Sequence, residues 1–158
     1  MPFSVSVRER CMYSHTLRFG SGAPFRTGCT AVVDAIFTGD ALGADGILID
    51  ITAAQRVPVI VLKRVLERYD HQDLDALTEF ARVNTTVEQV AFSVFEQMVA
   101  SFLEREVASA ADAGIGGHIT KLEIKVAESD VASASYYESD DRGILQGKAA
   151  DGWKPSRR

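Results

Sequence analysis

An aspartate and a histidine are adjacent at Asp70 and His71, where a stretch with helical periodicity ends. A carboxylate beside an imidazole can raise the basicity of the ring and fix its tautomer, which suits a general base near pH 7. A histidine at the C-terminus of a helix is also favoured by the helix dipole alone. The pair is therefore either a general base or a surface feature of a helix end.

A second carboxylate, Glu128, ends the last stretch of alternating residues and by parity shares the face of Leu122, Ile124 and Val126. A carboxylate in a row that faces the core is costly unless it is paired. Glu128 could bind a ligand by accepting two adjacent N–H groups. If the strand has already ended, Glu128 instead lies in a solvated loop.

One histidine and two cysteines form a third group, because His15 and Cys11 share a strand face and Cys29 opens the next strand. Histidine and cysteine are zinc ligands, which makes His15 and Cys29 candidate metal ligands. The spacing is loose, however, and a buried thiol commonly serves as a small hydrophobic group. A metal site and simple packing both remain open.

The composition limits the partners of these residues. The chain has 158 residues, a formal net charge of −5 and scattered basic residues, which argues against nucleic acid and anionic membranes. No run reaches the ~18 apolar residues of a membrane span. Two cysteines do not make a disulfide framework, and the N-terminus does not resemble a signal peptide. We therefore expect a cytoplasmic protein with reduced thiols.

Four segments, each with a period of two or a short apolar run, are the expected strands. Residues 3–15 and 30–38 predict two long strands joined by a glycine-rich loop over 19–28, which favours an antiparallel pair. Residues 47–49 predict a short third strand, and residues 118–128 predict the last one.

Two helices are expected between the strands. Residues 52–69 have helical spacing, with Pro58 tolerable in the first turns. Thr85 and Glu88 have the spacing of a capping box before a long amphipathic helix. Residues 70–84 are polar, with a helical turn or two. The pattern predicts one α+β domain over residues 1–138 and a loose polar tail over 139–158.

Five segments, in order, resemble the 6-pyruvoyltetrahydropterin synthase / 6-carboxytetrahydropterin synthase family. Its pattern contains F-x-A-A-H-R-L, G-hydrophobic-hydrophobic-D-F, L-D-H-x-x-L-N, N-P-T-x-E-N-hydrophobic-A and a closing E-T. The corresponding segments of this chain are Met12-Tyr13-Ser14-His15-Thr16-Leu17, residues 46–51, residues 69–74, residues 84–91 and residues 126–136. The resemblance extends from about residue 3 to about residue 137.

This resemblance implies a T-fold, in which an antiparallel four-stranded sheet carries two helices on one face. It also implies trimers joined edge to edge, stacked into a homohexamer, with a pterin bound at the subunit interface. Glu128 would anchor the heterocycle, and Asp70 and His71 would move protons. Zinc held by three histidines would polarise the substrate, and the chemistry would be that of a lyase.

Departures from the pattern lie in the metal motif and at the catalytic cysteine. The His-Gly-His motif of the family reads Thr27-Gly28-Cys29 here, so only His15 is unchanged. The position of the family's cysteine is Ala23. We therefore expect zinc to be weakly held or altered, with a site limited to His15 and Cys29.

Two functions remain. The first is a divergent lyase that acts on a pterin, or on a related heterocyclic or polyhydroxylated substrate, by proton transfer assisted by Asp70 and His71. The alternative is a non-catalytic or repurposed T-fold protein that binds a pterin or purine-like ligand.

Overall fold

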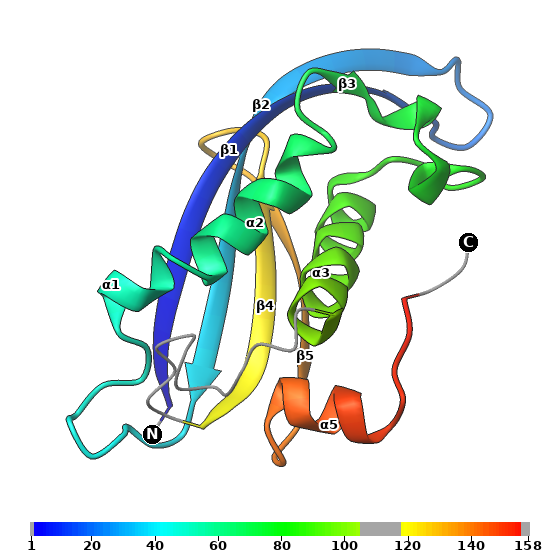
Figure 1. The fold of residues 1–158 in the computed structure, drawn as a ribbon. Helices are drawn as coiled ribbons and strands as arrows, with labels where there is room; N and C mark the ends of the chain where they lie inside the picture. The colour runs from blue at the N-terminus through cyan, green and yellow to red at the C-terminus, as the bar shows by residue number, and fades with distance from the viewer. Residues whose placement is uncertain (1, 105–117, 156–158) are drawn as a thin grey trace.

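A twisted five-stranded sheet with the order β3-β1-β2-β4-β5 forms the frame of the computed structural model, which describes residues 2–104 and 118–155 (Figure 1). The strands are β1 (Phe3–Leu17), β2 (Phe25–Gly39), β3 (Gln72–Asp73), β4 (Ile119–Ala127) and β5 (Ser133–Ser139). β1 and β2 pair antiparallel along their whole length, and β4 and β5 continue the antiparallel ladder. The predicted α+β class is confirmed.

The strand count differs slightly from the expected four. β3 is only two residues long and pairs parallel with Tyr13 and Ser14 of β1. The fourth antiparallel strand is β5, whereas the strand predicted at residues 47–49 is wrong, because only an isolated bridge forms there, at Ile49. Leu48 and Ile49 are both buried, so they enter the core from an irregular segment.

The helices are α1 (Ile51–Ala54), α2 (Pro58–Glu67), α3 (Val87–Glu104) and α5 (Ile144–Ala150). The single helix predicted over residues 52–69 is divided, because Pro58 occupies the first turn of α2 and lacks the N–H that a continuous helix would need. The polar segment after α2 contains two short 3-10 turns, Leu74–Ala76 and Thr78–Phe80.

The cap of α3 lies one residue later than the sequence predicts. Thr86 Oγ1 accepts a hydrogen bond from the backbone N–H of Gln89, at 3.4 Å. The Thr85 hydroxyl instead donates to Asp75 Oδ1, at 3.0 Å. Thr85 is thereby free of the capping role and faces β1.

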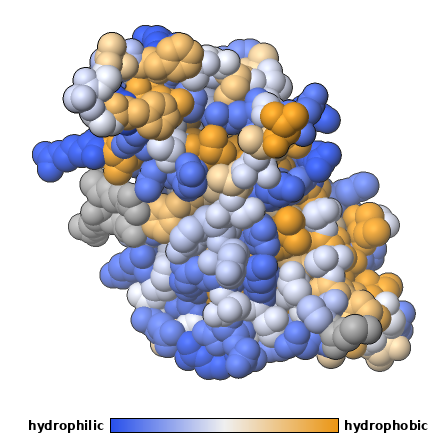
Figure 2. Space-filling model, turned by 180° about the vertical axis from the view of Figure 1, so that it is seen from behind, coloured by the Kyte–Doolittle hydropathy of each residue, from blue (hydrophilic) through white to orange (hydrophobic). Residues whose placement is uncertain are grey.

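The core lies between one face of the sheet and the helices. α2 packs against β1, and α3 packs against β4 and β5. Alternation along β1 buries Cys11, Tyr13 and His15 on this face and leaves Met12 exposed on the other. Figure 2 shows the molecule from behind, where hydrophobic groups lie at the upper end and along the right side, among hydrophilic ones. Phe19 and Phe25, in the β1–β2 hairpin, are among the exposed hydrophobic residues.

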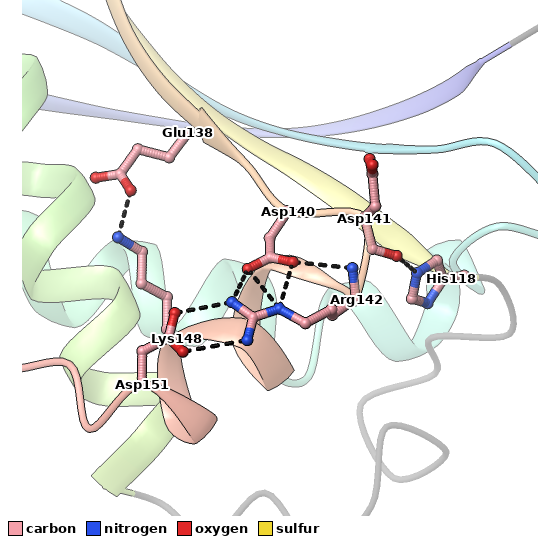
Figure 3. Close-up of polar contacts among 7 residues, drawn as sticks. All are labelled: His118, Glu138, Asp140, Asp141, Arg142, Lys148 and Asp151. Carbon is pink, nitrogen blue, oxygen red and sulfur yellow. Dashed lines mark hydrogen bonds and ion pairs between the residues drawn. The ribbon is translucent and has the colours of Figure 1, made fainter.

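The tail predicted to be loose contains α5, which one ion pair ties to the sheet and two further ion pairs brace from within the tail (Figure 3). Lys148 on α5 pairs with Glu138 on β5. Arg142 pairs with Asp140 at 2.6 Å and with Asp151 at 2.8 Å. Ile144 is buried, and Leu145 and Trp153 pack against the core, so this polar segment still offers apolar anchors that a composition argument overlooks.

None of the helices in the described part of the chain has the length and apolar character needed to cross a membrane.

Candidate functional site

Glu128, directly after β4, lies beside two residues of β1. Tyr13 donates its hydroxyl proton to Glu128 Oε1 at 2.7 Å, and His15 Nε2 lies 3.7 Å from the same oxygen. The side chain of Glu128 is 21% exposed, whereas that of His15 is fully buried. The carboxylate therefore keeps contact with solvent on one side and with a buried polar pair on the other.

The tautomer of neutral His15 follows from its other ring nitrogen. His15 Nδ1 lies 2.5 Å from the carbonyl oxygen of Thr85, and a carbonyl can only accept, so Nδ1 carries the proton. Nε2 is then a bare acceptor. It is the buried side-chain atom without a hydrogen-bond partner among the residues that the structure describes.

Tyr13 is a neutral hydrogen-bond donor in this cluster. Burial, followed by the negative charge of Glu128, raises the pKa of the Tyr13 phenol far above its ordinary value. Its ring meets the ring of His15 edge-on, with centroids 5.5 Å apart and an interplanar angle of 85°. The tyrosine thus contacts both the carboxylate and the histidine.

Asp70 and His71 lie at the opposite edge of β1, after the end of α2. Asp70 Oδ1 accepts the Met12 N–H at 2.8 Å, and the His71 N–H donates to the Met12 carbonyl at 2.6 Å. His71 Nε2 lies 3.6 Å from Asp70 Oδ2, and the side chains are 67% and 41% exposed. His71 has a positive φ of 57°, so its backbone is left-handed. The pair is thus held on β1 by the carboxylate of Asp70 and the backbone N–H of His71, and it is open to solvent.

Two cavities separate these groups within one chain. A cavity of about 460 Å³ is lined by Glu128, Glu88 of α3 and the segment after β4. A more open cavity of about 680 Å³ is lined by His71 and Met12 among others. Gly28 and Cys29 line both cavities. The structure thus places Glu128 beside His15. Gly28 and Cys29, near the start of β2, separate them from His71 and its neighbour Asp70.

The residues present do not fit the three-histidine zinc centre that the resemblance implies. Thr27 lies opposite His15 in the β1–β2 register, and Cys29 lies opposite Tyr13. Over residues 2–104 and 118–155, no three His, Cys, Asp or Glu side chains are grouped so that they could hold a metal ion. Burial, followed by the charge of Glu128, raises the pKa of the Cys29 thiol to about 11, which disfavours the thiolate that zinc binds.

Tyr13 and Thr85 are the members of the cluster that the sequence did not single out. Alternation placed Tyr13 on the face of His15, but its contact with Glu128 spans 115 positions. Thr85 was assigned to the cap of α3, and its carbonyl oxygen instead fixes His15. His118 lies elsewhere, with Nε2 2.8 Å from the Asp141 carbonyl oxygen (Figure 3).

The sequence matches one protein family, and the structure matches the fold of solved structures that carry the name of that family. The family described as 6-pyruvoyl tetrahydropterin synthase matches residues 4–139. Among curated proteins, none matches the sequence.

Solved structures of three enzymes with that name share the fold. The Plasmodium vivax enzyme is 12% identical, covering 89% of this chain and 99% of that chain, with a TM-score of 0.64. The Plasmodium falciparum enzyme is 15% identical, covering 88% and 99%, with a TM-score of 0.64. The Caenorhabditis elegans enzyme is 17% identical, covering 86% and 96%, with a TM-score of 0.53.

Proposed function

Because the chain belongs to the 6-pyruvoyl tetrahydropterin synthase family, we propose that it is a divergent pterin-related lyase in which Glu128 anchors the heterocycle. The observation that carries this proposal is the half-buried Glu128 carboxylate, which borders a cavity of about 460 Å³ and is fixed by the Tyr13 hydroxyl. An oriented carboxylate can accept two parallel N–H groups, which is the donor pattern of an aminopyrimidine edge.

Asp70 and His71 are the proposed proton-transfer residues. Their ring nitrogen and carboxylate are 3.6 Å apart and open to solvent, which leaves His71 able to reach a bound substrate. Proton transfer by a positioned imidazole typically contributes ~10²–10⁴-fold to a rate.

The separation of the two cavities suits a site shared between copies of the chain. β5 and most of β1 are edge strands, and an unpaired edge is a template for another strand. We therefore propose a trimer-based homo-oligomer, most simply a hexamer. In it, His71 of one subunit would meet the Glu128 cavity of its neighbour.

The proposed proton transfer does not depend on zinc. The family resemblance favours the ion, whereas Thr27 and Cys29 replace two of its ligands. We propose that any zinc is held weakly, through His15 and Cys29, and is not retained through chelator dialysis.

The anchor is tested by titrating pterin, which is fluorescent, into the wild type and Glu128→Gln. The change removes the charge and turns one acceptor into a donor, so affinity should fall by about tenfold or more. The matched control is Glu123→Gln on β4, because Glu123 pairs with Lys121 at 2.7 Å away from the cavity. Equal affinity of the wild type and Glu128→Gln would refute the anchor.

The shared site is tested by mixing two variants of reduced activity, at a substrate concentration well below saturation. Oligomers of His71→Ala and of Glu128→Gln are dissociated, combined and reassembled, and turnover of a pterin substrate is measured. Mixed oligomers would contain some intact sites and regain part of the activity. Activity that does not rise, although mass spectrometry detects mixed oligomers, would contradict a site shared in this way.

The alternative function is binding without turnover. Ala23, in the β1–β2 hairpin, occupies the position of the family's cysteine and offers no thiol for a proton relay. A wild-type protein that binds pterin and turns over no pterin substrate would favour this alternative.

A further inference from the structure

The cluster of Tyr13, Glu128 and His15 contains a further departure from the family pattern, at Tyr13. In F-x-A-A-H-R-L the residue two positions before the histidine is alanine, and here it is Tyr13. We infer that Tyr13 is a positioning residue that orients Glu128, so that the carboxylate of Glu128 binds hydrogen-bond donors of the ligand directly. This inference rests on the proposed function.

The first step is the restraint on Glu128. A phenol has one proton, and Tyr13 donates it to Oε1 at 2.7 Å from a side chain that is 4% exposed. The tyrosine ring cannot move away, because it is buried and packs edge-on against His15. A carboxylate held at one oxygen by a buried donor loses rotational freedom before the ligand arrives, which lowers the entropic cost of binding.

The second step is the unsatisfied pair that results. His15 Nε2 and Glu128 Oε1 are both acceptors and lie 3.7 Å apart, so they cannot bond to each other without a donor between them. Leaving a buried acceptor unpaired costs free energy. Nε2 is enclosed, whereas Glu128 borders the cavity, so the carboxylate is the member of the pair that a ligand's N–H or O–H group can meet.

The third step concerns metal binding, for which the cluster of Tyr13, Glu128 and His15 is poorly suited. Thr27 and Cys29 lie where two further ligands would be needed, and the described residues offer no three-donor cluster. Tyr13 instead occupies the space between β1 and Glu128 with a neutral donor. The cluster thus selects a ligand by its hydrogen-bond donors.

The test compares Tyr13→Phe with Tyr69→Phe. Both changes remove one hydroxyl from a buried tyrosine, and the Tyr69 hydroxyl contacts Ser93 at 2.9 Å, in the core and away from the cluster. Pterin affinity should fall about tenfold in Tyr13→Phe, as expected for loss of a hydrogen bond to a charged group, and should stay within about twofold in Tyr69→Phe. Lumazine, in which a carbonyl replaces the amino donor of pterin, should bind both variants and the wild type with similarly low affinity.

A readout without ligand separates this inference from the proposed function. The chain has three histidines, so His15 ring signals can be assigned in nitrogen-15 NMR spectra with His15→Gln. Tyr13→Phe should move the Nε2 signal of His15, because Glu128 is released, and Tyr69→Phe should leave it unchanged.

The outcomes are distinct. Unchanged pterin affinity in Tyr13→Phe, or an unmoved His15 signal, overturns the inference even if the wild type binds pterin well. The His15 signal could move in Tyr13→Phe while the wild type binds no pterin. That outcome supports the positioning role of Tyr13 and refutes the proposed ligand class instead.

Discussion

His15 and Thr27 lie directly opposite each other in the β1–β2 register, and Tyr13 and Cys29 form the next pair on the same face. Side chains directly opposite in an antiparallel pair have Cβ atoms about 4.5–5.5 Å apart. A histidine at position 27 would therefore face His15, and one at position 29 would lie diagonally from it. The register therefore brings positions 15, 27 and 29 close together, and of these only position 15 carries a histidine.

Grafting the missing ligands should create a zinc site. The double change Thr27→His and Cys29→His adds two neutral imidazoles on the face of His15, which gives the three protein ligands of a catalytic zinc centre. Elemental analysis after chelator dialysis should find about one zinc per subunit in the double variant and much less in the wild type. The same double change with His15→Gln should lose the ion. A full equivalent of zinc in the dialysed wild type would contradict the prediction.

Removing the charge of Asp70 should lower turnover without unfolding the loop. Asp70→Asn retains an oxygen that can accept the Met12 N–H, and loses the carboxylate next to His71. Turnover of the confirmed substrate should fall by ~10²-fold or more in Asp70→Asn and in His71→Ala. His118→Ala, at a histidine bound to the Asp141 carbonyl, is the control and should keep its rate. Wild-type kinetics in both test variants would remove the pair from the mechanism.

The Cys29 thiol should react slowly and its rate should depend on Glu128. With its pKa raised to about 11 by burial and then by the charge of Glu128, Cys29 is protonated at neutral pH and ionises as the pH rises through that value. At pH 8 only about one thiol in a thousand is the reactive thiolate.

Glu128→Gln removes the negative charge, so the pKa of Cys29 should fall and alkylation by iodoacetamide at pH 8 should accelerate several-fold. The measurement is mass spectrometry in a Cys11→Ala background. Glu123→Gln should have no effect, and an unchanged rate in Glu128→Gln would show that the charge of Glu128 does not reach the thiol.

Neighbouring prolines in β5 should separate assembly from folding. Alternate residues of an edge strand direct their N–H groups to β4 or to the open edge, and proline removes that donor. We compare Ala134→Pro with Ser135→Pro. The variant that loses an N–H at the open edge should keep the thermal stability of the subunit and lower the oligomer mass in sedimentation. The variant that loses an N–H directed to β4 should mainly destabilise the fold. Wild-type protein that sediments as a stable 17.2 kDa monomer at micromolar concentration would refute the assembly.

Local periodicity was sufficient to predict the long strands and α3, because burial on one face imposes a period on the sequence. It missed β5, whose exposed and half-buried residues alternate without any fully buried member. It also joined α1 and α2, because Pro58 is acceptable in a first turn and only the structure decides which turn is the first.

For the candidate site, sequence could nominate individual residues and not their partners. His15 and Glu128 were both singled out, yet for separate roles, and their proximity depends on the β1–β2–β4 order of the sheet. Tyr13 was read only as one of the alternating residues of its strand, since nothing local signals a carboxylate 115 positions away. The pairing of Asp70 with His71 was visible because the two are adjacent, and their separation from the Glu128 cavity was not.

The left-handed backbone of His71 has a consequence for evolution and for engineering. Glycine adopts this conformation freely, whereas a side chain there costs the fold on the order of 1 kcal/mol. Mutation toward stability alone would therefore favour glycine at position 71. A programme that selects variants for heat resistance would be drawn to this substitution, and would discard the imidazole that the proposed chemistry requires.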